Sequence, residues 1–258
     1  GADYDACMAY TADIGHSVRK VKGLLEAFGL EKKIRIAFDE WNLRQWYHPK
    51  VHCIEQGVTK EEYVVPRDDN DINSQYTMAD AVFTASFLSM CNRNCDIVGM
   101  ANFAPIVNTR GCIYTYPDGI VLRSTYHVFD LYVNYLGDIV LDMWQEEVPV
   151  KQMKRIDGEI VEVEQLDVLV TAFSDHAGYA VAAINKSADE ELSFTLELDA
   201  AGTVTVDYIC GDSTEAYNDV DHDGVVIQHK ELGIFESGMM ITLPPHSVNV
   251  IRIGVEEV

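Results

Sequence analysis

The periodicity of hydrophobic residues changes at Gly137, and this change limits the fold more than any other feature of the sequence. Up to Gly137 the chain follows a helix-strand-helix-strand-helix order, which is typical of βα units with parallel strands. After Gly137 come short segments of alternating hydrophobic residues, separated by turn residues at roughly regular intervals. That pattern is typical of an antiparallel, jelly-roll-like β-sandwich. We therefore predict an α/β domain over residues 1–137 and an all-β domain over residues 138–258.

Periodicity and capping residues place the expected elements. In the first domain we expect helices at 5–28, 77–91 and 124–136, strands at 33–38 and 96–103, and a long loop at 43–75. Thr77 and Asp80 form a capping box for the second helix, and Ser124 is expected to cap the third. In the second domain we expect strands at 139–144, 160–164, 168–173, 179–185, 192–198, 204–208, 225–228, 239–243 and 248–253.

The first domain is too small to stand alone as an α/β sheet. Parallel sheets normally have both faces covered, and two parallel strands cannot provide such a sheet. The chain also begins at Gly1 without an initiator methionine. We therefore expect residues 1–137 to be the last βα units of a larger α/β domain whose N-terminal portion is missing.

Charge and cysteine usage narrow the choice of partners. The formal net charge of −23 repels phosphate backbones and anionic lipid, so nucleic acid and membrane surfaces are poor partners. No run of about 18 apolar residues is present, so no membrane span is expected. The six cysteines form no C-x-x-C pair, so reduced and mostly buried thiols are favoured over a zinc site. Reduced thiols in turn favour a cytoplasmic location.

The first predicted strand ends in two acids, a tryptophan and an amide (Asp39, Glu40, Trp41 and Asn42). Active sites of α/β barrels gather at the carboxyl ends of the strands, so these side chains are candidates for chemistry. The plainer alternative is a strand-end acid that caps the following turn. Strict alternation would put Phe38 and Glu40 on one face and Asp39 and Trp41 on the other. Alternation alone does not decide which acid faces the barrel axis.

Glycoside hydrolysis gives a chemical reason for grouping acids with an aromatic residue and an amide. It uses two carboxylates across the scissile bond, while aromatic rings stack on the sugar and amides bind hydroxyl groups. Asp39 and Glu40 cannot be that pair if neighbouring strand residues point in opposite directions. The second catalytic acid must then come from elsewhere.

The motifs along the whole chain resemble family 51 glycoside hydrolases, the intracellular α-L-arabinofuranosidases. The motifs that carry the resemblance are F-D-E-W-N at 38–42, W-Y-H at 46–48, A-D-A at 79–81, M-A-N-F at 100–103, V-N-T-R-G at 107–111, Y-H-V-F at 126–129 and L-P-P-H-S-V at 243–248. The resemblance implies a (β/α)8 TIM barrel followed by a C-terminal β-sandwich, and a retaining mechanism. This chain would then hold only the last two barrel strands, their helices and the sandwich.

The resemblance also implies roles for individual residues. It makes Glu40 the nucleophile on barrel strand seven, with Asp39 as a supporting residue. The family's acid/base is the Glu of an Asn-Glu motif, and this chain contains no Asn-Glu dipeptide. Trp41, Asn42, Trp46 and Asn102 would contact the substrate, an arabinose-containing oligosaccharide. No metal or organic cofactor is implied. Homo-oligomers are implied, and the rest of the barrel would come from a longer chain or another chain.

Two departures from the family pattern leave alternatives open. Many members carry Ala-Gln after the strand-eight Asn, whereas this chain has Pro105, which cannot donate an amide hydrogen bond. Trp46 also follows Asn42 at a longer spacing than in the family, so it either stacks on sugar or packs the loop. The alternatives are another glycone or a β-glucan as substrate, or a non-catalytic fragment with a structural, association or sugar-binding role.

The second domain contains one metal-like motif, D-x-D-x-D-G at 219–224. A calcium loop would need a Glu at its twelfth position, where this sequence has Lys230. We therefore predict an acidic hairpin turn there. His127, among the apolar residues of the third helix, is expected to serve helix packing.

Overall fold

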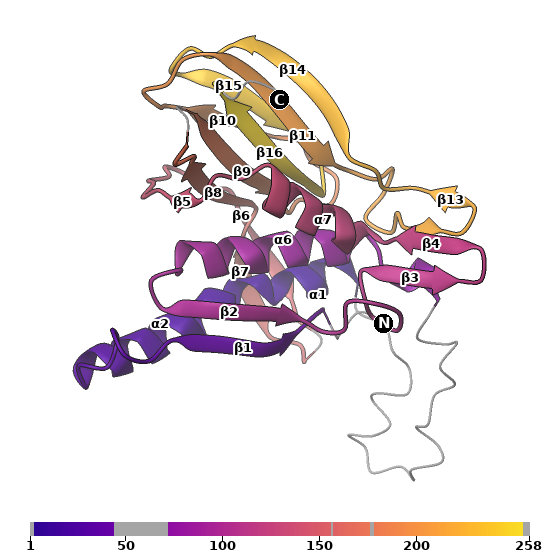
Figure 1. Ribbon diagram of the computed structural model, residues 1–258, viewed down its shortest axis with the longest axis horizontal. Coiled ribbons are helices and arrows are strands. Elements are labelled where there is room, and N and C mark those ends of the chain that lie inside the picture. Colours follow the sequence, from indigo (N-terminus) through magenta and orange to yellow (C-terminus); the bar gives the residue numbers. More distant parts are fainter. Residues whose placement is uncertain (1–2, 44–71, 156, 176–177, 255–258) are drawn as a thin grey trace.

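The structure is a computed structural model that describes residues 3–43, 72–155, 157–175 and 178–254 (Figure 1). The helices in these residues are α1 (Tyr4–Ala9), α2 (Thr11–Ala27), α6 (Met78–Arg93) and α7 (Ser124–Asn134), with a 3-10 helix η1 (Asn73–Gln75). The strands before residue 137 are β1 (Ile36–Trp41), β2 (Val98–Phe103), β3 (Ile113–Tyr116) and β4 (Gly119–Leu122). The helix-strand-helix-strand-helix order predicted for this part is confirmed.

The part after residue 137 is built from strands. They are β5 (Ile139–Val140), β6 (Val150–Lys154), β7 (Ile160–Glu164), β8 (Leu166–Ala172), β9 (Tyr179–Asn185), β10 (Leu192–Leu196), β11 (Thr203–Ile209), β12 (Asn218–Asp219), β13 (His222–Asp223), β14 (Gln228–Ile234), β15 (Met239–Leu243) and β16 (Ser247–Ile253). Six of them form one sheet in the order β14-β11-β16-β9-β8-β5, with antiparallel pairing throughout.

The β10–β15 pair lies against one face of the six-stranded sheet. Ile241 and Leu243 of β15 share a buried hydrophobic cluster with Val181 of β9 and Ile251 of β16. Alternating residues of these strands face the cluster because side chains on a strand point to opposite faces in turn. The predicted all-β, antiparallel character of this part is therefore confirmed.

β1 and β2 pair in parallel, as predicted from the alternating order of helices and strands. One face of the pair is covered by helices, and Phe38 and Phe103 on that face join the main hydrophobic cluster. The opposite face is open, and Met100 on it is 48% exposed. The other exposed residues of the two strands are Ala37, Asp39, Glu40, Gly99 and Asn102.

Helix α6 lies between the β1–β2 pair and the six-stranded sheet (Figure 1). Both sides of the helix are therefore covered, and its residues are buried over nearly its whole length. Its N-terminus has the predicted capping box, because Asp80 Oδ2 accepts a hydrogen bond of 2.8 Å from Thr77 N. Apolar packing on two sides holds the helical and the β part together through one continuous hydrophobic cluster.

Two helix predictions need correction. The helix expected at 5–28 is divided at Tyr10, whose N–H bonds to Cys7 O and ends α1 before α2 begins. Ser124 does not cap α7, because Arg123 occupies the N-cap position. The Ser124 hydroxyl instead donates a hydrogen bond of 2.7 Å to the Thr77 carbonyl, which ties α7 to the start of α6.

One strand prediction is wrong, and several strands, among them β3, β4 and β6, were not predicted. Residues 225–228 do not form a strand, because the Asn218 side chain occupies both the N–H and the C=O of Val225, at 2.7 Å each. The strand begins only at Gln228 and runs to Ile234. Strand β6 was not predicted, although its pairing with β7 forms a hairpin.

Candidate active site

A β-bulge interrupts the pairing of β1 with β2 at the acid pair. The register pairs Phe38 with Ala101 and Trp41 with Phe103, so Asp39 and Glu40 together face Asn102. A bulge of this kind places two residues opposite one and locally bends the strand. The strict alternation expected from the sequence is therefore wrong at this point. Phe38 and Trp41 lie on the same face of the strand instead of on opposite faces.

Contacts with α6 show why the bulge forms. The Phe38 and Trp41 rings both contact Phe87 of α6, with centroids at 5.1 and 4.2 Å. Without the extra residue, Trp41 would point to the open face and expose its indole. Burial of a large aromatic side chain thus stabilises the bulge, and the bulge leaves both acids on the exposed part of the strand.

Trp41 belongs to an aromatic cluster in the core. Its indole stacks on Phe87, meets Phe103 edge-on at 5.1 Å and lies 6.2 Å from Phe129. Only 8% of the residue is exposed. This placement favours packing over the sugar contact that the resemblance implied for Trp41.

Asp39, Glu40 and Asn102 lie together at the carboxyl edge of the two parallel strands. All three residues are exposed. Within the described residues their side chains make no hydrogen bond or ion pair. Their carboxylate and amide groups are therefore accessible from the open face of the strands, where a barrel would have its active site.

Within the described part of the chain, the side chain of Asn42, unlike those of Asp39 and Glu40, is hydrogen-bonded to the backbone. Its Nδ2 donates hydrogen bonds to the carbonyls of Arg110 (2.9 Å) and Ala104 (3.4 Å), and its Oδ1 accepts one from Leu43 N. Both amide protons are thus directed to the backbone of the segment after β2. These hydrogen bonds hold the segment after β2 against the end of β1. The sugar contact implied for Asn42 would therefore be limited to the remaining lone pair of Oδ1.

Arg123 also hydrogen-bonds the backbone of the segment after β2. The side chain is completely buried, and its Nη1 donates to the carbonyls of Thr109 (2.7 Å) and Gly111 (2.8 Å). Its Nε donates to Asn73 Oδ1 at 2.8 Å, and its guanidinium lies 3.8 Å above the Tyr76 ring. The fixed fork of an arginine allows these bonds at once. No sequence signal predicts this role, because a lone arginine before a helix is normally exposed.

The acidic hairpin of the second part is linked to this arginine. β12 and β13 pair as a short hairpin, which confirms the turn predicted for the D-x-D-x-D-G run. Asn73 Nδ2 donates to Asp219 Oδ1 at 2.8 Å, and the Asn73 Oδ1 accepts from Arg123. Among the described residues no group of three or more His, Cys, Asp or Glu side chains is placed to hold a metal ion.

Burial shifts the pKa values of Asp80 and His127, which belong to helices α6 and α7. Burial raises the pKa of Asp80 to about 7, although hydrogen bonds from Thr77 and the charge of Arg123 oppose the increase. Burial lowers the pKa of His127. The His127 ring lies 3.4 Å from Asn218 Nδ2 and edge-on to Tyr126, a contact pattern that supports the packing role expected for it.

Trp46 lies outside the described residues, so the sugar contact that the resemblance implied for it stays a prediction. His48 of the W-Y-H motif also lies outside them. Cys53 also lies outside them. The five described cysteines are free thiols, of which Cys7, Cys91 and Cys112 are buried. In the described part of the chain, no helix has both the length and the apolar composition needed to cross a membrane.

Exposed carboxylates at the ends of parallel strands, with helices behind them and an antiparallel β part beside them, fit the class of α/β glycoside hydrolases. The comparison with protein families identifies the particular family. The model of the α-L-arabinofuranosidase C-terminal domain matches residues 39–247, which is most of the chain. The chain therefore belongs to this family.

Individual relatives agree with the family. A probable α-L-arabinofuranosidase C of Aspergillus clavatus is 26% identical over 232 residues, covering 86% of this chain and 40% of the relative. An intracellular exo-α-L-arabinofuranosidase of Bacteroides ovatus is 24% identical over 257 residues, covering 97% of this chain and 46% of the relative. This chain thus spans less than half the length of these two relatives.

Solved structures have the same fold over nearly all of this chain. The family 51 α-L-arabinofuranosidase of Thermotoga petrophila is 25% identical with a TM-score of 0.76, covering 99% of this chain and 50% of that one. The Thermotoga maritima enzyme in complex with arabinose gives a TM-score of 0.79 at 23% identity, covering 98% of this chain and 50% of that one.

Proposed function

We propose that this chain is the nucleophile-bearing part of a retaining α-L-arabinofuranosidase that releases terminal α-L-arabinofuranosyl groups from plant oligosaccharides. The observation that carries the proposal is the exposed Glu40 at the carboxyl edge of β1, inside the segment matched by the family model. Family membership supports the reaction class, and the names of the relatives support the glycone.

In the proposed mechanism Glu40 attacks the anomeric carbon and displaces the leaving alcohol. An acid outside this chain protonates the leaving oxygen, and a covalent ester forms between the sugar and the Glu40 carboxylate. The same outside group then removes a proton from water, which attacks the anomeric carbon and frees the sugar with retained configuration. Asn102, opposite the bulge, is placed to hydrogen-bond a sugar hydroxyl.

The rest of the site would come from barrel strands that this chain does not contain. The open face of β1–β2, with Met100 half-exposed, is unusual for parallel strands and would be covered by those strands. This chain covers only 40% of the Aspergillus clavatus relative and 50% of the Thermotoga maritima enzyme. These shares support the proposal that further barrel strands complete the site. We accordingly propose residues 1–137 as the end of a (β/α)8 barrel and residues 138–258 as its C-terminal β-sandwich.

Hydrolysis of p-nitrophenyl α-L-arabinofuranoside tests the proposal. The chain would be assayed alone and fused behind the N-terminal half of the Bacteroides ovatus relative. We expect activity only from the fusion, and loss of it in Glu40→Ala. The matched control is Glu236→Ala, which removes an exposed acid of the β part. Activity that survives Glu40→Ala would contradict the proposed nucleophile.

Two alternatives are tested by the same fusion. p-Nitrophenyl β-glucoside and β-cellobioside replace the arabinofuranoside to test the β-glucan alternative, which Pro105 keeps open. A folded fusion that cleaves none of these substrates would favour a non-catalytic role in structure, association or sugar binding. The absence of an Asn-Glu dipeptide favours this role for the chain alone.

We also propose a cytoplasmic location and a homo-oligomeric state. The five free thiols support the location, because disulfides form in oxidising compartments. Sedimentation of the fusion would test the oligomeric state.

A further inference from the structure

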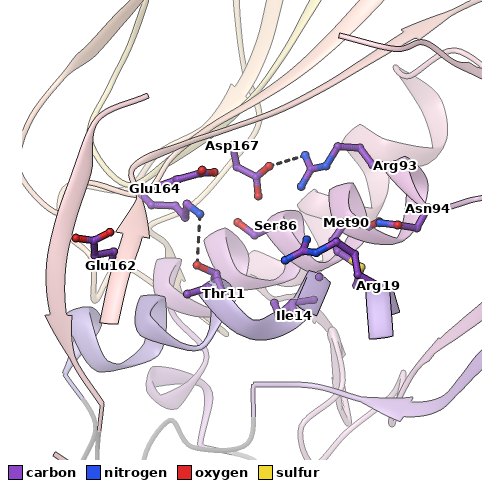
Figure 2. A pocket seen from close by; sticks show the side chains of 13 residues that line it. Thr11, Ile14, Arg19, Ser86, Met90, Arg93, Asn94, Glu162, Glu164 and Asp167 are labelled. Atoms are coloured by element: carbon purple, nitrogen blue, oxygen red, sulfur yellow. Dashed lines mark hydrogen bonds and ion pairs between the residues drawn. The ribbon is translucent and has the colours of Figure 1, made fainter. Parts of the chain in front are cut away.

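A polar pocket lies at the junction of the helical part and the β part. Residues of helices α2 and α6 line one side, and residues of strands β7 and β8 line the other (Figure 2). Lys186 also lines the pocket. We call it the junction pocket, and its volume is about 280 Å³. This volume is many times the roughly 10–15 Å³ that a cavity needs to hold one water molecule. The pocket is therefore large enough for a small organic molecule.

The junction pocket is separate from the carboxylates of β1. Ser86, Met90 and Arg93 face the pocket from α6, whereas Phe87 of the same helix packs on Trp41. Helix α6 therefore lies between the pocket and the strands that carry Glu40. A ligand in the pocket would not touch the proposed catalytic residue.

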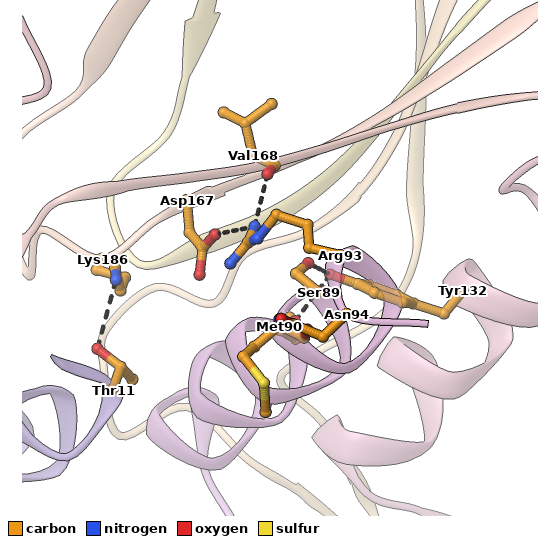
Figure 3. A network of polar contacts seen from close by, with 10 residues as sticks. Thr11, Ser89, Met90, Arg93, Asn94, Tyr132, Asp167, Val168 and Lys186 are labelled. Carbon is orange, nitrogen blue, oxygen red and sulfur yellow. Dashed lines mark hydrogen bonds and ion pairs between the residues drawn. The ribbon is translucent and has the colours of Figure 1, made fainter. Parts of the chain in front are cut away.

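Lys186 reaches the pocket as a nearly buried cation with few partners. Only 5% of the residue is exposed, and its Nζ lies 3.3 Å from Thr11 Oγ1 (Figure 3). No second hydrogen-bond acceptor for Nζ is present among the described residues. An ammonium group carries three donors, so two of them are available to a ligand. Burial lowers the pKa of Lys186, while the charges of Asp167 and Glu164 oppose this effect.

Ser86 supplies a second polar atom without a partner. The residue is 2% exposed, and within the described part of the chain its Oγ has no hydrogen-bond partner. A buried hydroxyl is nearly always hydrogen-bonded to protein, water or ligand. Ser86 therefore marks a place where a bound molecule can donate or accept a hydrogen bond.

The charges around the pocket are balanced. Three cationic side chains (Arg19, Arg93 and Lys186) face three acidic ones (Glu162, Glu164 and Asp167). Arg93 is already engaged, because its Nη1 contacts Asp167 Oδ1 at 2.5 Å and Val168 O at 2.6 Å (Figure 3). A pocket without net charge favours neither an anion nor a cation. Its many polar groups disfavour an apolar ligand.

We propose that the junction pocket binds a small neutral polyhydroxylated molecule of about monosaccharide size. Hydroxyl groups both donate and accept, so they can satisfy cations and carboxylates together. Sugar oxygens would accept from Lys186 and from Arg19, whose guanidinium lies over Gly15 at the pocket edge. Sugar hydroxyls would donate to Glu164, while Met90 offers an apolar contact for C–H groups. This proposal does not depend on the hydrolase activity.

Methyl NMR of the 258-residue chain with L-arabinose as the probe tests this inference. Met90 and Ile14 line the pocket, so their methyl signals report on it, whereas Met100 reports on the open face of β1–β2. We expect saturable shifts of Met90 and Ile14 at millimolar sugar, unchanged in Glu40→Gln. Shifts confined to Met100 would reveal sugar at the proposed active site alone. They would overturn the proposal that the junction pocket binds sugar.

Substitutions and a charged probe complete the test. Arg19→Ala changes an exposed residue and should leave the fold intact, and loss of its charged hydrogen bond should weaken the Met90 response about tenfold. Ser86→Ala should weaken the Met90 response less. Lys186→Met should abolish the response, and unchanged circular dichroism of this variant would show that it is still folded. Equal responses in Arg19→Ala and the parent chain would overturn the proposal. Shifts of Met90 with inorganic phosphate but not with L-arabinose would overturn it as well.

Discussion

The side-chain amide of Asn42 donates a hydrogen bond of 2.9 Å to the backbone carbonyl of Arg110. This bond joins the end of β1 to the segment that follows β2. Asn42 itself lies two residues after Glu40, the proposed nucleophile. We therefore expect the position of Glu40 to depend on this contact between the end of β1 and a loop residue far along the sequence. The contact assigns to Asn42 a positioning role.

Asn42→Ala should therefore loosen the edge that carries Glu40. Loss of the bonds to Arg110 and Ala104 should lower the free energy of unfolding by about 1–2 kcal/mol. In the active fusion kcat should decrease while the protein stays folded. Asn134→Ala, which removes an exposed amide, is the control for both measurements. An unchanged urea midpoint in Asn42→Ala would argue against this role.

Arg123→Lys should destabilise the chain although charge is conserved. A lysine cannot reach the Thr109 and Gly111 carbonyls and Asn73 Oδ1 together, so buried acceptors lose their donors. We expect a decrease of about 2–4 kcal/mol in the free energy of unfolding, measured by urea denaturation. Arg19→Lys should change the same quantity by less than about 0.5 kcal/mol. Equal effects of the two substitutions would refute the role of Arg123.

The two tryptophans Trp41 and Trp144 should respond very differently to truncation. Trp41 is 8% exposed within its aromatic cluster, whereas Trp144 is 78% exposed. Trp41→Ala should lower the free energy of unfolding by about 3–5 kcal/mol, because it leaves a cavity beside Phe87. Trp144→Ala should stay within about 0.5 kcal/mol of the parent chain. A mild effect of Trp41→Ala would mean that the indole is not a core residue.

Asp80 should make stability depend on pH below neutrality. Its pKa is about 7 in the folded chain and 3.8 in the unfolded reference, so the folded state binds more protons between these values. Its contribution to stability is present below pH 3.8 and is lost as the pH rises towards 7, by up to about 1.4 kcal/mol per pH unit.

Asp80→Asn isolates this effect because it keeps a side-chain oxygen for the Thr77 N–H. The difference in free energy of unfolding between Asp80→Asn and the parent chain should grow in favour of the variant from about pH 4 to pH 7. Urea denaturation across this range measures it. A constant difference at all pH values would show that Asp80 does not titrate there.

Local sequence signals were sufficient for the main elements of the fold. Thr77 and Asp80 identified the start of α6, and the apolar run through Val98 identified β2. Both signals are local, because capping and strand periodicity involve residues near one another in the sequence.

Non-local contacts account for what the sequence did not predict. The bulge at Asp39 and Glu40 arises because Phe38 and Trp41 both pack on Phe87, which lies on another element. Asn218 similarly occupies the backbone of Val225 and prevents the strand expected there. Such contacts form only when the chain has folded, so patterns of neighbouring residues do not reveal them.

The central claim is that Glu40 is the nucleophile, and covalent trapping measures it most directly. A 2-fluoro arabinofuranoside with an activated leaving group should form a slowly hydrolysed ester in the active fusion, because the fluorine destabilises the oxocarbenium-like transition state. We predict that mass spectrometry of the digested protein places the added sugar on Glu40. A sugar found on Asp39 or on any other acid would contradict the account.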